Sequence, residues 1–335
     1  PVFGGKIQQI DDTQTLKVKG VLQVVRAERV LGKNRYEVVA VIASNYWAAL
    51  KGRKALKVTW DYQGNDQFST TQFEQQLRDL AKNEGVVDHN QGDFDKNYAE
   101  APVKLEAFYE TPMVSHSPME PMNCIASWTG DKVEVWASSQ GPDLLRNRVA
   151  EAFAIPADNI KVNIFFNGGG FGRRLYQDFA TEAVSIAKAA GKPVKVIWTR
   201  EDDMQNDFYR PAEMYRYRAA LTANELLAWH QSAVGIGRGI RGDSYVAGAM
   251  ANYRSDSQGF TSNTPTGWWR APGACTMAYV AESFFDEVCV ELKKDPVAFR
   301  LDFFKKAKDA PVGRVGYDPT KYKAVVELVA KMSNW

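Results

Sequence analysis

The sequence predicts an α+β fold in which short strands and amphipathic helices follow one another along 335 residues. Two kinds of periodicity support this prediction. Some stretches alternate apolar and polar residues, as half-buried strands do, and others repeat apolar residues every three or four positions, as helices do. A run of glycines between one strand and one helix adds a third observation, because such a run predicts a turn with an exposed backbone.

The N-terminal part combines strands with one short helix. β-Branched and aromatic residues favour strands at Val21–Val25, Tyr36–Ala43 and Leu56–Trp60. A short helix is expected at about Tyr46–Leu50 between the last two. We therefore expect a small α/β domain over residues 1–62.

Residues 63–100 are polar, with Gln, Asn, Asp and Lys throughout. Phe73, Leu77 and Leu80 have helical spacing within Thr71–Lys82. The remainder of this segment is expected to be an exposed linker. The predicted organisation is thus a domain at 1–62, a linker at 63–100 and a larger domain at 101–335.

The larger domain mixes strands and helices. Pro142 is a favourable first residue for a helix that carries Leu145, Val149 and Phe153 on one face. The other predicted elements are strands at Lys132–Ala137, Ile160–Phe166 and Val194–Trp198, a helix at Asp178–Ala190 that stops at Gly191, and a final helix in Tyr322–Trp335.

The stretch from Asn167 to Arg174, NGGGFGRR, is the most informative part of the chain. Four glycines in five positions give up side-chain packing and backbone entropy, so they indicate a sharp turn or close contact with a ligand. Free backbone N–H groups followed by Arg173 and Arg174 suit an anionic group. A purely structural turn is the alternative.

A dinucleotide fold does not fit the spacing of these glycines. In a Gly-x-Gly-x-x-Gly fingerprint that starts at Gly168, the third glycine falls on Arg173. From Gly170 it falls on Leu175. The acidic run at 201–203 lies about 30 residues on, where a ribose-binding acid is expected after about 20. An NAD-binding oxidoreductase is therefore the less favoured reading.

GGGFG after a strand resembles the first cofactor loop of the xanthine dehydrogenase and aldehyde oxidase family of molybdenum hydroxylases. The form with two arginines is most similar to the large (beta) subunits of the isoquinoline 1-oxidoreductase branch. The resemblance covers nearly the whole chain, because other family motifs follow in order at His116–Cys124, Ser138–Pro142, Trp198–Pro211, Gly267–Gly273, Glu282–Glu287 and Lys294–Leu301.

The resemblance implies part of a hammerhead-like α/β domain followed by the first half of a molybdopterin-binding domain. On this reading the chain is a fragment. The family's catalytic glutamate lies in a Gly-Glu-Pro-Gly-type segment, and the sequence contains no such segment. The chain alone is therefore expected to be inactive, and a non-catalytic fragment or assembly scaffold is a second interpretation.

The same resemblance assigns site residues. Gln140 and Arg270 are expected to be catalytic, Gln140 through its amide beside the metal and Arg270 beside the substrate. A buried structural pair is expected between His116 and Glu120. The residues expected to bind the cofactor are Gln140, Gly169, Gly170, Phe171, Gly172, Arg173 and Arg270.

The expected substrate pocket contains Leu175, Trp268 and Trp269. Two tryptophans next to Arg270 can stack on a flat ring. Leu175 stands where purine-oxidising relatives carry a substrate-binding glutamate. Oxidation of N-heteroaromatics or aldehydes, with water as the oxygen donor, is therefore expected in place of xanthine oxidation.

Composition limits the partners. A net charge of +2 gives no reason to expect nucleic acid. Cys124, Cys275 and Cys289 lie too far apart for an iron–sulfur or zinc motif, and no side-chain metal site is expected.

The resemblance supplies the cofactors and partners. It implies a molybdenum cofactor in its cytosine dinucleotide form, [2Fe–2S] clusters on a small partner subunit, and an electron acceptor such as a cytochrome. The compartment stays open between periplasm and cytoplasm.

Overall fold

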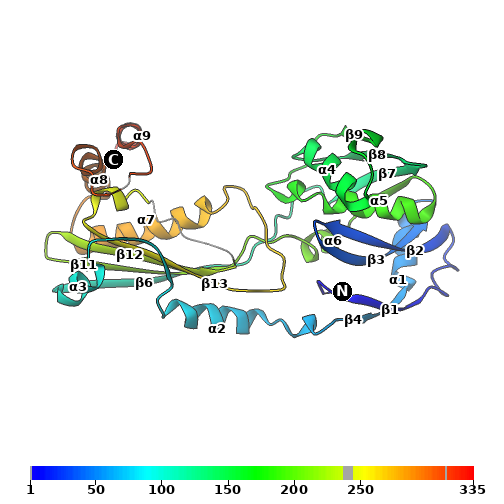
Figure 1. Ribbon diagram of the computed structural model, residues 1–335, viewed down its shortest axis with the longest axis horizontal. Coiled ribbons are helices and arrows are strands. Elements are labelled where there is room, and N and C mark those ends of the chain that lie inside the picture. Colours follow the sequence, from blue (N-terminus) through cyan, green and yellow to red (C-terminus); the bar gives the residue numbers. More distant parts are fainter. Residues whose placement is uncertain (1, 237–243, 314) are drawn as a thin grey trace. The chain divides into compact units, whose positions relative to one another are not determined.

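The computed structural model describes residues 2–236, 244–313 and 315–335 (Figure 1). Its mixture of strands and helices confirms the predicted α+β class. The chain forms two compact units, each assembled from three separate segments. Unit 1 comprises Pro1–Phe68, Val114–Arg210 and Asn263–Arg270, and unit 2 comprises Ser69–Met113, Pro211–Ser262 and Ala271–Trp335.

Unit 1 begins with two antiparallel strand pairs and a helix. The first strand was not predicted, and the other elements lie near their predicted positions. The N-cap Asn45 starts the helix by accepting a hydrogen bond from the Ala48 N–H. The pairs are β1 (Lys6–Asp11) with β4 (Lys57–Asp61) and β2 (Val21–Leu31) with β3 (Asn34–Ala43), and the helix is α1 (Tyr46–Ala55).

The second sheet of unit 1 has the strand order β10-β7-β8-β9. Strands β8 and β9 are parallel neighbours, so the loops that follow their carboxyl ends start at the same edge of the sheet. The strands are β7 (Asn123–Thr129), β8 (Lys132–Ala137), β9 (Ile160–Ile164) and β10 (Val194–Ile197), and the helices are α4 (Pro142–Phe153), α5 (Asp178–Ala190) and α6 (Arg200–Gln205).

Helix α5 forms the centre of unit 1. Its apolar residues, including Phe179 and Ile186, are buried in one cluster with residues of β7 and β8. Its polar side chains bind an edge of β2: Thr181 Oγ1 accepts from the Val30 N–H at 3.1 Å, and Ser185 Oγ accepts from the Glu28 N–H at 2.9 Å. The helix that follows the glycine loop is thus held on more than one side.

Unit 2 is a five-stranded sheet in the order β5-β13-β12-β11-β6 with a helix, α7, packed on it (Figure 1). Trp229, Tyr217 and Phe284 meet in its core. The strands are β5 (Val86–Gln91), β6 (Val103–Thr111), β11 (Glu213–Leu221), β12 (Leu226–Gly235) and β13 (Asn252–Gly259), and the helices are α2 (Thr70–Ala81), α3 (Phe94–Glu100), α7 (Ala274–Glu291), α8 (Pro296–Asp309) and α9 (Pro319–Ser333).

Residues 63–100 differ from the linker that the sequence predicts. The expected helix is present as α2, which buries Phe73 and Leu77 in unit 2. The remainder contains β5, which pairs with β13, and α3. The polar composition concealed the strand because β5 is an edge strand of the sheet with mostly exposed side chains. The two compact units also mix segments that a contiguous division at residues 62 and 100 keeps apart.

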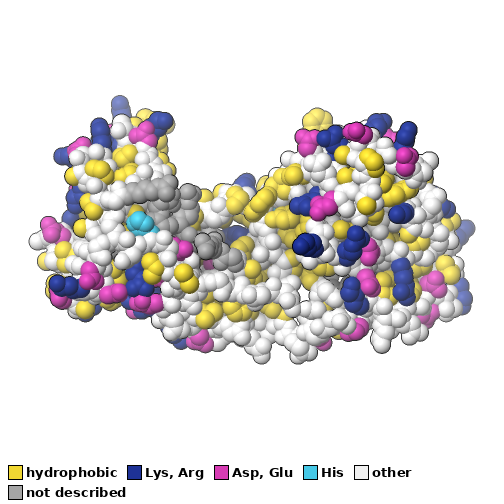
Figure 2. All heavy atoms as spheres, viewed as in Figure 1, with side chains coloured by type: hydrophobic (Ala, Val, Ile, Leu, Met, Phe, Trp, Pro, Cys, Tyr) yellow, Lys and Arg dark blue, Asp and Glu magenta, His cyan; other side chains and the backbone are white. Residues whose placement is uncertain are grey.

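The surface carries charges of both signs. On the face in Figure 2, basic and acidic side chains are interspersed. The apolar residues Val325, Leu328, Val329 and Met332 of α9 are exposed. Among the described helices, none combines the length and the apolar composition that crossing a membrane requires.

Candidate cofactor-binding site

The glycine run forms the loop between β9 and the short turn η3 (Arg173–Leu175) that precedes α5. Three of its residues have positive φ: Gly169 at 101°, Phe171 at 55° and Gly172 at 110°. Phe171 is the one non-glycine residue among these three. Three of the five positions from Gly168 to Gly172 therefore have a left-handed backbone, which glycine adopts with least strain.

Three glycines are needed because three different neighbours approach the backbone. A Cβ atom at Gly168 would lie 2.4 Å from Cβ of Glu120, and one at Gly170 would lie 2.4 Å from Oε1 of Gln140. A Cβ atom at Gly172 would lie 1.8 Å from the carbonyl oxygen of Trp268. The cluster is thus explained by close contact as well as by turning, which a lone structural turn does not require.

Gln140 follows β8 and lies against the loop, as the parallel pairing of β8 and β9 predicts. Its side-chain Oε1 accepts hydrogen bonds from the N–H groups of Gly172 at 3.0 Å and Arg174 at 3.3 Å. Two donors on one side identify that atom as the oxygen. The Nε2 group is the other end of this exposed amide, and no hydrogen bond of Nε2 occurs among the described residues.

Three consecutive N–H groups of the loop are left without a partner among the described residues, although Gly170 is itself buried and Gly169 is half-buried. Those of Gly169, Gly170 and Phe171 have no hydrogen-bond partner in the part of the chain that the structure describes. The neighbouring N–H groups are all used, by Glu120 at Gly168 and by Gln140 at Gly172. Successive N–H groups in a backbone that alternates in handedness form a concave site for an anion or an oxo group.

The side chain of Arg173, which the sequence predicts to bind the cofactor, is paired with buried acids in this structure. It is fully buried and forms a bidentate ion pair with Asp178, with N–O distances of 2.6 and 3.0 Å. Its Nε also lies 3.1 Å from Asp207 Oδ1. Burial by itself lowers the pKa of Arg173, but these carboxylates outweigh it and hold the pKa above its usual value. Its role is to neutralise buried acids, which sequence alone does not reveal.

Arg174 is buried as well, and it contacts the loop from the inside. Its Nε donates to the Gly169 carbonyl at 2.7 Å, and its Nη2 donates to Glu120 Oε2 at 2.8 Å and to the Glu120 carbonyl at 2.9 Å. Burial raises the pKa of Glu120, but hydrogen bonds from Asn123 and Gly168 and the charge of Arg174 outweigh it, so the pKa lies below its usual value.

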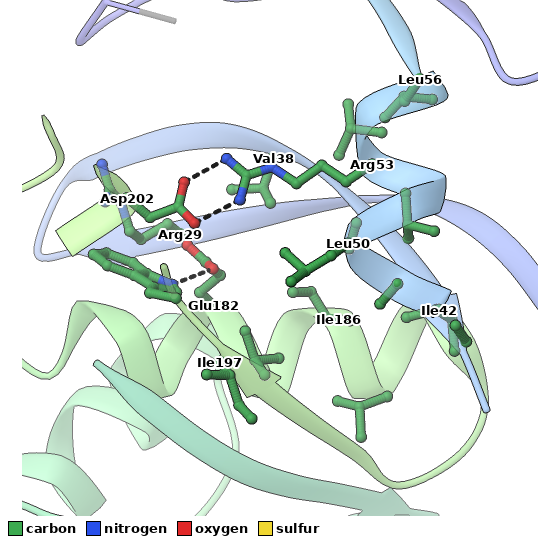
Figure 3. A pocket seen from close by; sticks show the side chains of 18 of the residues that line it. Arg29, Val38, Ile42, Leu50, Arg53, Leu56, Glu182, Ile186, Ile197 and Asp202 are labelled. Carbon is green, nitrogen blue, oxygen red and sulfur yellow. Dashed lines mark hydrogen bonds and ion pairs between the residues drawn. The ribbon is translucent and has the colours of Figure 1, made fainter. Parts of the chain in front are cut away.

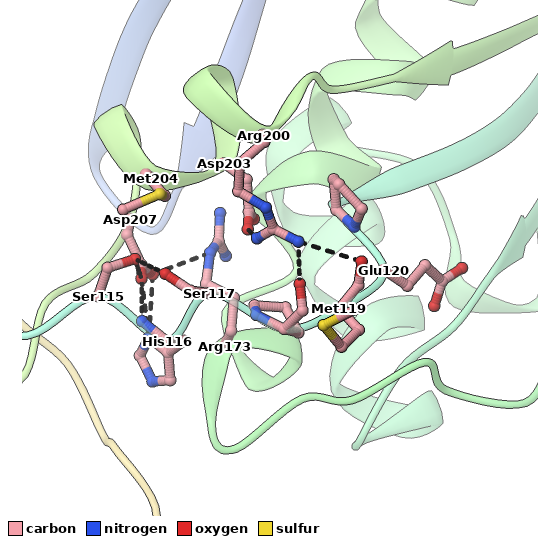
Figure 4. Close-up of polar contacts among 12 residues, drawn as sticks. Ser115, His116, Ser117, Met119, Glu120, Arg173, Arg200, Asp203, Met204 and Asp207 are labelled. Carbon is pink, nitrogen blue, oxygen red and sulfur yellow. Dashed lines mark hydrogen bonds and ion pairs between the residues drawn. The ribbon is translucent and has the colours of Figure 1, made fainter.

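His116 pairs with Asp207, so the predicted pair with Glu120 is wrong (Figure 4). Its Nδ1 lies 3.0 Å from Asp207 Oδ1, and its Nε2 lies 2.9 Å from the Trp268 carbonyl oxygen. Burial raises the pKa of Asp207, yet the hydrogen bond from His116 and the charge of Arg173 hold it below the usual value. His116 thus links a buried carboxylate to the segment that touches Gly172.

The three side chains at 268–270 differ in their exposure to solvent. Arg270 is exposed, and its guanidinium lies 5.6 Å from the centre of the Phe171 ring. Trp268 is 61% exposed, whereas Trp269 is half-buried with Arg210 over its ring at 5.7 Å. Leu175 is half-buried in η3. The structure therefore brings Gln140, the glycine loop and Arg270 together.

A cavity of unit 1 lies elsewhere. It has a volume of about 920 Å³ and is lined mainly by β3, α1, the end of α5 and β10, without Gln140 or the glycine loop (Figure 3). Glu182, on its wall, accepts a hydrogen bond from Trp198 Nε1 at 2.9 Å. Burial raises the pKa of Glu182 to about 7. We place the candidate site at the loop, because the unpaired backbone donors and Gln140 lie there and not in this cavity.

Sequence reasoning missed three parts of the site: Asp207, Glu120 as the partner of Arg174, and the Trp268 carbonyl. Asp207 lies in the stretch Trp198–Pro211 that carried the resemblance, which was the available signal. No metal-binding group of three or more His, Cys, Asp or Glu side chains occurs among the described residues.

Known proteins are similar to this chain throughout. The molybdopterin cofactor-binding domain model matches residues 77–304. A membrane-bound aldehyde dehydrogenase (pyrroloquinoline-quinone) of Gluconacetobacter polyoxogenes is 29% identical over 99% of this chain and 47% of its own length. The isoquinoline 1-oxidoreductase subunit beta of Brevundimonas diminuta is 27% identical over 100% of this chain and 44% of its own length.

A solved structure has a similar fold. The aldehyde oxidoreductase from Desulfovibrio gigas superposes with a TM-score of 0.71 at 17% identity, over 99% of this chain and 42% of its own. The chain spans about half the length of the curated relatives it matches. Because the family model covers more than half of its residues, the chain belongs to the molybdopterin cofactor-binding domain family.

Proposed function

We propose that this chain forms the molybdenum-cofactor-binding part of an oxidoreductase that hydroxylates N-heteroaromatics or oxidises aldehydes. The observation that carries the proposal is the row of three N–H donors at Gly169, Gly170 and Phe171, next to the outward Nε2 of Gln140. Four uncharged donors at one edge of a sheet suit an oxygen-rich, anionic group. The family match names such a group.

In this proposal, different residues of the chain bind the cofactor and contact the substrate. The loop N–H groups and the Gln140 amide would hold the cofactor, which supplies the centre for two-electron oxidation when bound. Arg270 lies over Phe171, and the exposed face of Trp268 is available to a flat ring. The resemblance puts Leu175 where purine-oxidising relatives carry a substrate-binding glutamate, so no carboxylate stands at that position. These features favour an aromatic heterocycle or an aldehyde over xanthine.

Finer features follow from the same proposal. The cofactor is the cytosine dinucleotide form, and [2Fe–2S] clusters on a small partner subunit pass electrons to an acceptor such as a cytochrome. Two of the three cysteines, Cys124 and Cys289, are buried and all three are far apart in sequence, which supports clusters held by another chain.

The test uses the complete protein with its partner subunits. Molybdenum and iron are measured per polypeptide, cytidine monophosphate is sought after acid hydrolysis, and quinone cofactor is sought in the same extract. Dye reduction is then compared for isoquinoline, an aromatic aldehyde and xanthine. A protein without molybdenum contradicts the proposed cofactor. Xanthine turnover equal to that of isoquinoline contradicts the proposed substrate class.

A further inference from the structure

The three available N–H groups share one feature: each belongs to a peptide group whose carbonyl is held on the inner side of the loop. The Gly168 carbonyl accepts from the Glu120 N–H at 3.1 Å. The Gly169 carbonyl accepts from Arg174 Nε at 2.7 Å, and the Gly170 carbonyl accepts from the Arg173 N–H at 2.8 Å. The N–H groups of these three peptides are those of Gly169, Gly170 and Phe171.

Because the peptide group is planar, a contact that fixes a carbonyl also fixes the direction of the next residue's N–H. In a planar trans peptide, the C=O and the N–H of the next residue point in opposite directions. A carbonyl that is fixed on one side of the loop therefore turns the following N–H to the opposite side. Glycine permits many orientations, so without such contacts the peptide planes between Gly168 and Gly170 would be free to rotate.

Arg174 supplies the one inner contact of the three that comes from a side chain. The contacts at Gly168 and Gly170 are made by backbone N–H groups, whereas the contact at Gly169 is made by the guanidinium. The same guanidinium is held in place by two bonds from Nη2 to Glu120. Glu120 Oε2 also accepts from the Gly168 N–H at 2.8 Å, so the pair spans the start of the loop.

Stability alone does not account for Arg174. Burial lowers the pKa of its guanidinium, and Nη1 has no hydrogen-bond partner among the described residues. A buried cation with an unsatisfied nitrogen is costly, and an apolar side chain is often as stabilising in such a place. What an apolar side chain lacks is the Nε donor to the Gly169 carbonyl.

We infer that Arg174 is a positioning residue that fixes the Gly169–Gly170 peptide with its carbonyl inward and thereby aims the Gly170 N–H at the bound cofactor. Glu120 holds Arg174 in that orientation. This inference rests on the proposed function, because it assumes that the loop N–H groups face the cofactor.

The experiment compares three variants of the complete protein with its partner subunits. Arg174→Lys keeps the charge but replaces the planar fork by one terminal nitrogen, which cannot reproduce the contacts to Gly169 and Glu120 together. Glu120→Gln is nearly isosteric and weakens the hold on Nη2. Arg173→Lys is the matched control, because it alters a buried arginine of the same loop whose side chain touches Asp178 and Asp207 and no loop carbonyl.

Three quantities are measured for each variant: molybdenum per polypeptide, kcat and KM per bound molybdenum, and melting temperature. For Arg174→Lys we expect kcat to fall about tenfold or more, since one donor to the reacting group is misdirected. KM should stay within about twofold, and molybdenum content should fall. Glu120→Gln should show the same pattern with a smaller loss. Arg173→Lys should lower the melting temperature without the selective fall in kcat.

Two outcomes overturn the inference. In the first, Arg174→Lys matches Arg173→Lys in kcat per molybdenum and in molybdenum content. In the second, Arg174→Lys fails to fold and Glu120→Gln leaves both quantities at the wild-type level. Failure of the proposed function is recognised separately, because the wild-type protein would then contain no molybdenum.

Discussion

Glu182→Gln tests the electrostatics of unit 1. Glu182 is 8% exposed, and burial raises its pKa to about 7 from an ordinary value of 4.5. At about 1.4 kcal/mol per pKa unit, this difference corresponds to roughly 3 kcal/mol between the two protonation states. Glutamine keeps an oxygen that can accept from Trp198 Nε1 but never ionises.

The sign follows from linkage. The folded state binds the Glu182 proton more tightly than the unfolded state, so this group's contribution is fully present below about pH 4.5. This contribution to the free energy of unfolding is lost as pH rises through about 7. Wild type should therefore lose about 2–3 kcal/mol relative to Glu182→Gln between pH 5 and pH 8. For a unit of this size that is a relative change of about 5–10 °C in melting temperature.

The assay is thermal unfolding of both proteins at several pH values between 5 and 8. Glu134→Gln is the control, because the hydrogen bond from Lys161 lowers the pKa of Glu134 and it does not titrate in this range. The difference in melting temperature between Glu182→Gln and wild type should grow with pH, and that for Glu134→Gln should stay constant. A pH-independent difference for Glu182→Gln would refute the reasoning.

Three further changes probe the loop and its supports. Gln140→Ala should reduce kcat per bound molybdenum by about 10²-fold, because it removes an amide donor that faces the cofactor in the proposed function. The melting temperature should fall by only a few degrees. An altered melting temperature with intact kcat would assign Gln140 a structural role only. Gly172→Ala should cost more than about 2 kcal/mol, since φ is 110° and the new Cβ would meet the Trp268 carbonyl at 1.8 Å. Gly191→Ala, at φ 66° with open space around it, is its control in urea unfolding and should cost less. His116→Phe removes both ring contacts and should cost about 3–5 kcal/mol in the same assay, with His116→Gln intermediate; equal stability of all three proteins would contradict the importance of the Asp207 pair.

Local pattern alone predicted much of the frame of the site. The helix at Asp178–Ala190 and the strand at Lys132–Ala137 were predicted with the bounds that the structure shows. Both have a strong periodicity and a clear stop, and those signals depend on residues within one turn or one pleat. The glycine run also identified the loop, because glycines in such number have few other causes.

The tertiary structure alone decided which way each side chain at the loop faces. Arg173 and Arg174 are adjacent and chemically identical, yet one binds Asp178 and Asp207 and the other binds Glu120 and a loop carbonyl. His116 pairs with Asp207, which lies 91 positions away in sequence, although Glu120 is much nearer in sequence. Likewise, β5 lies in the sheet because β13 pairs with it from a distant segment. The partner of a buried charge or of a strand edge is set by whichever group the fold brings within hydrogen-bonding distance, and separation along the chain carries no information about that distance.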